Sequence, residues 1–213
     1  MSEPDTHAIG STVPGHFGPA GTDVVLRAAT LAAVWNVQGD PARASIVADV
    51  AHLFDVALPL EPNTVTRTAA VVAMWLGPRS WLLIAGALGG PANALVEFDA
   101  KRDALNIGGG ALFDVSASRV AYTLRGSNAA TVLARGCPLD FASRVFKPGH
   151  CAQSVFGHVN ALIYRHAATP AFTVMVARSL AADVWRGLCV AASTDGYDVQ
   201  APAPFDAASA AEG

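Results

Sequence analysis

The chain has 213 residues, of which 52% are hydrophobic and 15% are charged, and its formal net charge is −3 at pH 7. A soluble domain usually carries charge on about a quarter of its residues, so this composition indicates that another protein covers part of the surface. A compact, alanine-rich enzyme is the alternative explanation. Nucleic-acid binding is not expected, because it requires a concentrated basic face and the two lysines, Lys101 and Lys147, stand apart.

The sequence further predicts a cytoplasmic protein that does not enter a membrane. Its three cysteines are an odd number, which fits no disulfide framework and suits a reducing compartment. The N-terminus lacks the basic head and apolar run of a secretory signal. The longest uncharged stretch, residues 80–96, is interrupted by glycines and by Pro91, whereas a membrane helix needs about twenty mostly apolar residues.

Three parts are expected along the chain. Residues 1–22 are rich in Pro, Gly and Thr and predict an extended N-terminal arm, and residues 194–213 predict a flexible tail. Between them, residues 23–193 predict a single α+β domain. One pattern of strand, helix, hairpin and helix occurs twice in this domain, at about 23–105 and 111–193.

In the first copy, residues 23–37 contain an extended apolar segment, and Asp40 and Pro41 predict the start of a helix. A hairpin is expected next, with strands at 69–76 and 81–84 around a Gly-Pro turn. Pro91 is expected to open a second helix. The apolar faces of the two helices are predicted to carry Ile46, Val50, Leu53 and Phe54 in the first, and Leu95, Val96 and Phe98 in the second.

In the second copy, apolar residues alternate with smaller or polar ones from position 120 to 124, which is typical of a strand. Ser127 is expected to cap a short helix that stops at Gly136. Residues 155–165 and 171–177 predict an antiparallel pair, and Ser179 is expected to cap the last helix. The residues that define the strand and the last helix are Val120, Tyr122 and Leu124, and Leu180, Val184, Trp185 and Leu188.

Candidate chemistry is sparse. The triplet Gly108–Gly110 follows a helix and precedes a strand, which is the reverse of a dinucleotide-binding loop. It is therefore interpreted as a connector, and no site for NAD, FAD or ATP phosphates is expected. His158 and Asn160 share one face of a strand, where they are expected to satisfy backbone groups or meet another subunit.

The residue types that bind metals gather only between Cys137 and His158, a group that also includes His150 and Cys151. Adjacent His150 and Cys151 point in different directions and Cys137 stands alone, so the spacing does not fit a structural zinc site. As nucleophiles, the cysteines lack a base that the sequence can place beside them. We therefore predict no catalytic, cofactor-binding or metal-binding residue in this chain.

One loop is predicted to contact a partner protein. It contains Phe146, Lys147, Pro148 and His150, and it combines an aromatic ring, a basic side chain and a Pro-Gly sequence that restricts the backbone. Loops that a rigid scaffold positions in this way commonly serve as contacts.

A resemblance to a known family is carried by the phrases RGCPLDF, FKPGHCAQ, GHVN and RSLAADVW. This resemblance, to the gamma subunit family of heterotetrameric sarcosine oxidase, extends over residues 23–193. It implies a fold similar to the folate-binding domains of aminomethyltransferases, and a scaffolding role beside alpha, beta and delta subunits. It also implies that the complex oxidatively demethylates sarcosine to glycine, passes the one-carbon unit to tetrahydrofolate and forms hydrogen peroxide. FAD, FMN and NAD would then belong to the alpha and beta chains, and zinc to delta.

Two alternatives remain open at this stage. The first is the equivalent subunit of a related secondary-amine demethylase, such as N-methylglutamate dehydrogenase. The second is a stand-alone folate-binding protein of the aminomethyltransferase or iron–sulfur-maintenance type. Proteins of the iron–sulfur-maintenance type carry a Lys-Gly-Cys-Tyr-x-Gly-Gln-Glu-like motif. The similar phrase in this chain begins at Arg135 and differs from that motif after Cys137.

Overall fold

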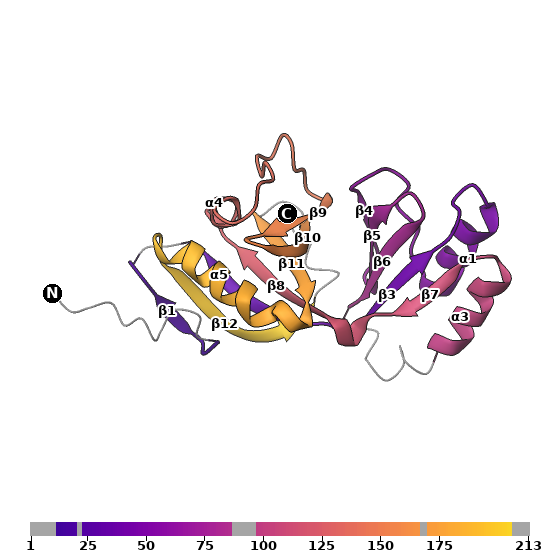
Figure 1. Ribbon diagram of the computed structural model, residues 1–213, viewed down its shortest axis with the longest axis horizontal. Coiled ribbons are helices and arrows are strands. Elements are labelled where there is room, and N and C mark those ends of the chain that lie inside the picture. The colour runs from indigo at the N-terminus through magenta and orange to yellow at the C-terminus, as the bar shows by residue number, and fades with distance from the viewer. Residues whose placement is uncertain (1–11, 21–22, 87–96, 167–169, 206–213) are drawn as a thin grey trace.

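The computed structural model describes residues 12–20, 23–86, 97–166 and 170–205. Two β-sheets meet through their inner faces, and helices cover their outer faces (Figure 1). The order of layers is therefore helix, sheet, sheet, helix, and the α+β prediction is confirmed. No helix in the described residues has the length and apolar character that spanning a bilayer requires.

The smaller sheet contains five strands in the order β4-β5-β6-β3-β7, and all its neighbouring strands are antiparallel. Helices α1 and α3 pack on its outer face, where Ile46, Val50 and Leu105 join its core. The elements of this layer pair are β3 (Ala33–Gln38), α1 (Ala44–Phe54), β4 (Val65–Arg67), β5 (Val71–Gly77), β6 (Ser80–Ala85), α3 (Phe98–Ile107) and β7 (Ala111–Asp114).

The larger sheet contains seven strands in the order β1-β12-β2-β8-β11-β10-β9. Strand β12 runs parallel to β2, and the other neighbours are antiparallel. Its elements are β1 (Gly15–Phe17), β2 (Val25–Thr30), η2 (Ser116–Ser118), β8 (Arg119–Arg125), α4 (Ala129–Ala134), β9 (Cys151–Phe156), β10 (Val159–Arg165), β11 (Ala171–Ala177), η3 (Arg178–Leu180), α5 (Ala181–Ser193) and β12 (Tyr197–Pro204).

The two sheets divide the chain into two units, whose bounds differ from those of the repeats expected at 23–105 and 111–193. Each unit has the order β-α-β-β-β-α-β: β3-α1-β4-β5-β6-α3-β7 in one sheet and β8-α4-β9-β10-β11-α5-β12 in the other. Strand β7 closes the first unit instead of opening the second. The segment expected as one extended stretch at 23–37 divides into β2 and β3, and β2 lies between β8 and β12 of the larger sheet.

The prediction of a flexible tail from residue 194 is wrong for the residues up to 205, which are folded. Residues Tyr197–Pro204 form strand β12 within the larger sheet, where the backbone pairs with both β1 and β2. Tyr197 and Val199, two positions apart, are both buried in the core of that sheet. Phe205 is buried between the two sheets. The expected arm is extended where it is described: β1 pairs with β12, and the ring of Phe17 stacks on Tyr197 with centroids 5.4 Å apart.

The hairpin of β5 and β6 confirms the Gly-Pro turn prediction. Helix α1 begins at Ala44, later than expected, because the carboxylate of Asp40 accepts the N–H of Ala42 and closes a turn that precedes the helix. Its buried face carries Ile46 and Val50 together with Phe54, as the spacing predicts. The expected opening of the second helix at Pro91, with Leu95 and Val96, lies outside the described residues.

In the second unit, the antiparallel pair of β10 and β11 is confirmed. Neither expected serine cap is formed. Helix α4 follows Asn128, while Ser127 donates its backbone N–H to the Asp23 carboxylate at 2.6 Å. Helix α5 begins at Ala181, and the single turn η3 that contains Ser179 precedes it. Three of the four predicted face residues of α5 are buried, namely Val184, Trp185 and Leu188.

A shared core joins the two sheets. Val34 and Ile84 from the smaller sheet meet Tyr164 and Met175 from the larger one, and all four are almost fully buried. The N–H of Cys151 also donates to the carbonyl of Asn63 at 2.8 Å, which ties β9 to the segment before β4. Burial of apolar surface on both sides of the junction makes the two sheets one folded body.

Candidate functional site

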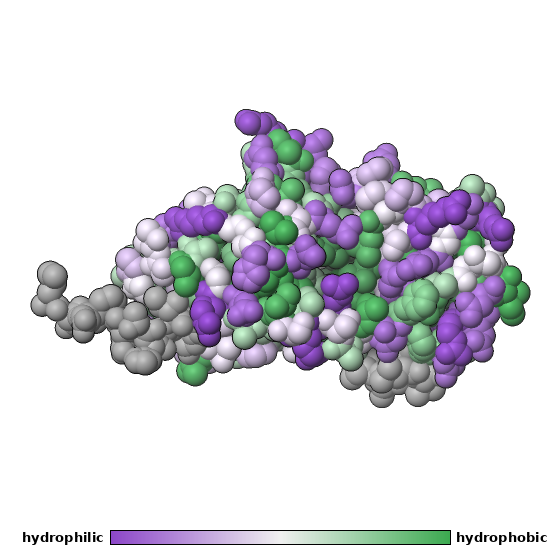
Figure 2. All heavy atoms as spheres, in the orientation of Figure 1, coloured by the Kyte–Doolittle hydropathy of each residue, from purple (hydrophilic) through white to green (hydrophobic). Residues whose placement is uncertain are grey.

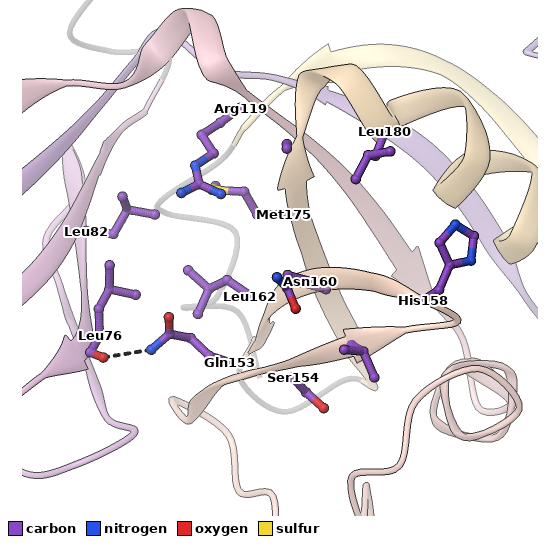
Figure 3. A pocket seen from close by; sticks show the side chains of 13 residues that line it. Leu76, Leu82, Arg119, Gln153, Ser154, His158, Asn160, Leu162, Met175 and Leu180 are labelled. Atoms are coloured by element: carbon purple, nitrogen blue, oxygen red, sulfur yellow. Dashed lines mark hydrogen bonds between the residues drawn. The ribbon is translucent and has the colours of Figure 1, made fainter.

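A cleft of about 790 Å³ lies where the two sheets separate (Figure 3). One wall comes from strands β5 and β6, and the other from strands β8 to β11. Apolar side chains form most of both walls, and polar side chains lie among them. The lining residues are Leu76, Leu82, Arg119, Gln153, Ser154, Val155, His158, Asn160, Ala161, Leu162, Met175, Ala177 and Leu180.

Strand alternation explains which side chains reach this cleft. Successive residues of a strand point to opposite faces, so Asn160 and Leu162 on β10 share the inner face of the larger sheet. Arg119, the first residue of β8, has the same orientation as Ala121 of the shared core. It lies opposite Ala177 in the antiparallel register of β8 and β11. The cleft is therefore a continuation of the inter-sheet core, at the edge where the sheets no longer touch.

Arg119 is the most unusual residue of the cleft. Its guanidinium points between the two walls toward Leu82 and Met175 (Figure 3). The Nε atom is buried and has no hydrogen-bond partner. Among the ion pairs of the described residues, none includes Arg119. A positive charge is thus held beside apolar walls without a compensating carboxylate from the described part of the chain.

The other polar groups lie toward the opening of the cleft, and three of them, Gln153, His158 and Asn160, are exposed. Gln153 donates its side-chain N–H to the carbonyl of Leu76 at 2.7 Å and so bridges the two sheets across the cleft. Among the described residues that line the cleft, none is Asp or Glu. This arrangement can hold an apolar group that carries an anion, but it offers no carboxylate pair for acid–base chemistry.

The loop predicted as a partner contact lies between α4 and β9 and rises from the top of the larger sheet in Figure 1. Phe146 does not face outward, which corrects its prediction as a contact. It is 6% exposed, stacks on Phe172 in the core, and its carbonyl accepts a hydrogen bond from buried Arg165 at 2.6 Å. The aromatic residue of the loop is its anchor, whereas Lys147 and Pro148 are exposed and His150 is half-buried.

The four residues weighed as metal ligands make separate contacts. Cys137 lies 3.6 Å from the Ser154 hydroxyl, and the Cys151 thiol donates to the backbone carbonyls of Thr64 and Trp75. Burial raises the pKa of Cys151 to about 12, so its thiol is protonated and unreactive at neutral pH. Within the ranges that the structure describes, no three His, Cys, Asp or Glu side chains are grouped so as to hold a metal ion.

Sequence reasoning did not select Arg119 or Gln153. A signal was available for both, since each is a polar residue at an inward position of a strand whose neighbouring inward positions are apolar or small, such as Ala121 and Cys151. His158 and Asn160 were expected at a strand end or a subunit contact, and the structure places both at the cleft.

Comparison with known proteins agrees with this architecture. The model of the family described as sarcosine oxidase, gamma subunit, matches residues 38–194. A search of the curated proteins found no match. Among solved structures, a chain of the heterotetrameric sarcosine oxidase from Corynebacterium sp. U-96, in complex with pyrrole 2-carboxylate, is similar with a TM-score of 0.73 and 24% identity, covering 91% of this chain and 95% of that chain.

The glycine cleavage system aminomethyltransferase T from Bartonella henselae is also similar, with a TM-score of 0.60 and 15% identity. The match covers 85% of this chain and 48% of the transferase, so this chain spans about half of that protein. These two structures confirm the predicted aminomethyltransferase-like fold. The family match extends over most of the chain, from the end of β3 to the residue after α5, and so covers most of both structural units. The chain therefore belongs to the sarcosine oxidase gamma subunit family.

Proposed function

We propose that this chain is a non-catalytic gamma subunit that acts as a scaffold within a cytoplasmic sarcosine oxidase complex, beside alpha, beta and delta subunits. In the proposed reaction the complex oxidises sarcosine to glycine, transfers the released one-carbon unit to tetrahydrofolate and reduces oxygen to hydrogen peroxide. FAD, FMN and NAD are assigned to the alpha and beta subunits, and zinc to delta. The single observation that carries this proposal is the family match over residues 38–194.

The contacts of the polar residues support a role without catalysis. The cysteine thiols are buried, and those of Cys137 and Cys151 lie against a hydroxyl and backbone carbonyls. The described residues of the cleft include Arg119 but no acidic residue that could exchange a proton with a substrate. A subunit of this kind contributes by positioning other chains and enclosing the space between them.

The surface supports association with other chains. Only 15% of the residues are charged, and Figure 2 shows apolar side chains gathered in the middle of the molecule, where the two sheets meet. Large apolar side chains are also exposed elsewhere, among them Ile107, which is 90% exposed, together with Phe113 and Val145. Contiguous apolar surface is characteristic of faces that a partner buries, whereas apolar side chains exposed singly are common on any protein. Lys147, Pro148 and His150 remain our predicted contacts in the loop before β9.

Deleting this chain from cells that make the complex tests the proposal. We expect the remaining subunits to dissociate or to lose stability, with loss of sarcosine-dependent hydrogen peroxide formation. A fully active assembly of the other three chains would contradict the scaffold role. The same preparation, assayed with N-methylglutamate in place of sarcosine, distinguishes the related demethylase complexes. Calorimetric titration of the purified chain with tetrahydrofolate tests a stand-alone folate-binding protein, for which tight binding would be required.

A further inference from the structure

The charge of Arg119 needs a partner. A cation that leaves water for apolar surroundings is costly unless it is paired or hydrogen-bonded, and nearly all buried polar groups in proteins have such partners. Arg119 Nε has none, and no described carboxylate forms an ion pair with the guanidinium. The lining of the cleft offers neutral amides, a hydroxyl and His158, but no acid. Arg119 is half-buried, and an anion supplied from outside the described residues would give its guanidinium a charged partner.

The backbone that carries Arg119 is held in place by Arg178. Arg178, on η3, donates its Nε–H to the carbonyl of Ala117 at 2.6 Å and an Nη2–H to the carbonyl of Arg119 at 3.4 Å. These bonds hold the start of β8 against the turn that follows β11. A guanidinium with a fixed backbone is suited to recognise a carboxylate through two parallel hydrogen bonds.

The composition of the cleft resembles the centre of a protein interface. Its depth is apolar, with Leu82, Leu162 and Met175 around the arginine, while exposed Gln153 and Asn160 form a polar rim. Protein interfaces have this arrangement of apolar core and polar rim, and arginine is among the residues that contribute most to their affinity. A volume of about 790 Å³ is sufficient for several side chains.

We infer that this cleft receives a segment of a partner subunit, in which an Asp or Glu flanked by apolar residues pairs with Arg119. The inference rests on the proposed function, because it requires that the chain assembles with other subunits. Charge complementarity defines the occupant: the cleft is cationic and free of acids, so the segment is acidic. The apolar walls define its neighbours, since they need apolar side chains to displace water.

Three variants of the tagged chain test the inference in the complex. Arg119→Gln removes the charge, Arg119→Lys keeps the charge without the planar fork, and Arg186→Gln removes a charge from the exposed side of α5 as a matched control. Breaking a buried charged pair weakens association by at least about 30-fold. We expect a loss of this size in the dissociation constant of Arg119→Gln, a smaller loss for Arg119→Lys, and affinity equal to that of the wild type for Arg186→Gln.

A second measurement identifies the occupant and does not depend on the stability of the variants. A photo-cross-linking amino acid at Val155, which lines the cleft, is activated in the assembled complex, and the linked peptide is sequenced. We expect a partner peptide that contains an Asp or Glu among apolar residues. A linked peptide without an acid, or no link to a partner, would overturn the inference.

The outcomes separate this inference from the proposed function. If the wild-type chain retains no partner, the proposed function fails and the inference fails with it. If the wild-type chain assembles and Arg119→Gln assembles equally tightly, only the inference fails. Titration of the complex with benzoate adds a third measurement. If benzoate binds the wild-type complex saturably, and Arg119→Gln abolishes that binding while assembly is unchanged, the cleft binds a free carboxylate. That result would overturn docking of a protein segment.

Discussion

The ring of Phe156 provides a sharp test of packing, because glycines lie at both of its edges. A Cβ atom added to Gly136 would lie 2.6 and 2.7 Å from two ring atoms, whereas one added to Gly187 would lie 3.1 Å from an atom of the opposite edge. Phe156 is only 5% exposed, and Gly187 prevents the ring from moving away from Gly136. Phe156 is the last residue of strand β9, which forms part of the cleft wall. The packing of its ring therefore also positions that wall.

We predict that Gly136→Ala destabilises the fold by about 1–3 kcal/mol, the usual cost of overpacking a core. For a chain of this size the midpoint of thermal unfolding falls by roughly 2–4 °C per kcal/mol. Gly187→Ala serves as the matched control. Its position inside helix α5 offers up to about 1 kcal/mol of helix propensity, which offsets the milder contact and leaves stability close to that of the wild type.

Equilibrium urea denaturation measures these differences, and a double-mutant cycle assigns them to the ring. In a Phe156→Leu background we expect Gly136→Ala to lose most of its cost, with a coupling free energy of about 1 kcal/mol or more. Equal costs for Gly136→Ala in the two backgrounds would show that the ring is not the obstacle, and the packing argument would be refuted.

Three further predictions concern individual polar groups. Arg165→Leu removes the donor to the Phe146 carbonyl, so amide hydrogen exchange in the loop before β9 should accelerate, while unchanged exchange would contradict the anchoring role. The hydrogen bond to Asp198 raises the pKa of His16 above 6.5. The pairing of β1 should therefore be strongest below pH 6.5, and the amide protons of β1 should lose protection, relative to intrinsic exchange, as the pH rises through the raised pKa. Asp198→Asn should abolish this pH dependence. Because the pKa of Cys151 is about 12, thiol reagents at mildly alkaline pH should modify it only after unfolding, and rapid modification of the folded chain would contradict its burial.

The elements that local sequence defines were predictable. The Gly-Pro turn marks the hairpin of β5 and β6, and the spacing of Ile46, Val50 and Phe54 marks the buried face of α1. These features depend on neighbours within a few residues, so a single sequence contains the whole signal. The exact helix starts were less accessible, because Asp40 caps a preceding turn as readily as a helix.

The errors concern long-range pairing. Strand β12 was interpreted as a tail because alanine and proline dominate it, although the alternation of Tyr197 and Val199 is a strand signal. Its partner β2 comes from the other end of the chain, and no local pattern shows that pairing. Phe146 was expected at a partner contact because its loop combines an aromatic ring, a basic side chain and a Pro-Gly sequence, yet in the fold it contacts Phe172 and Arg165. The cleft likewise arises only when the two sheets come together.

The central claim is that this chain functions as one subunit of a larger assembly. Native mass spectrometry of material purified through a tag on this chain tests that claim most directly. We predict a complex in which the 21.9 kDa chain is present together with three other, different subunits in equal amounts. A homogeneous species of the 21.9 kDa chain alone, obtained under conditions that preserve other complexes of the same cells, would contradict it.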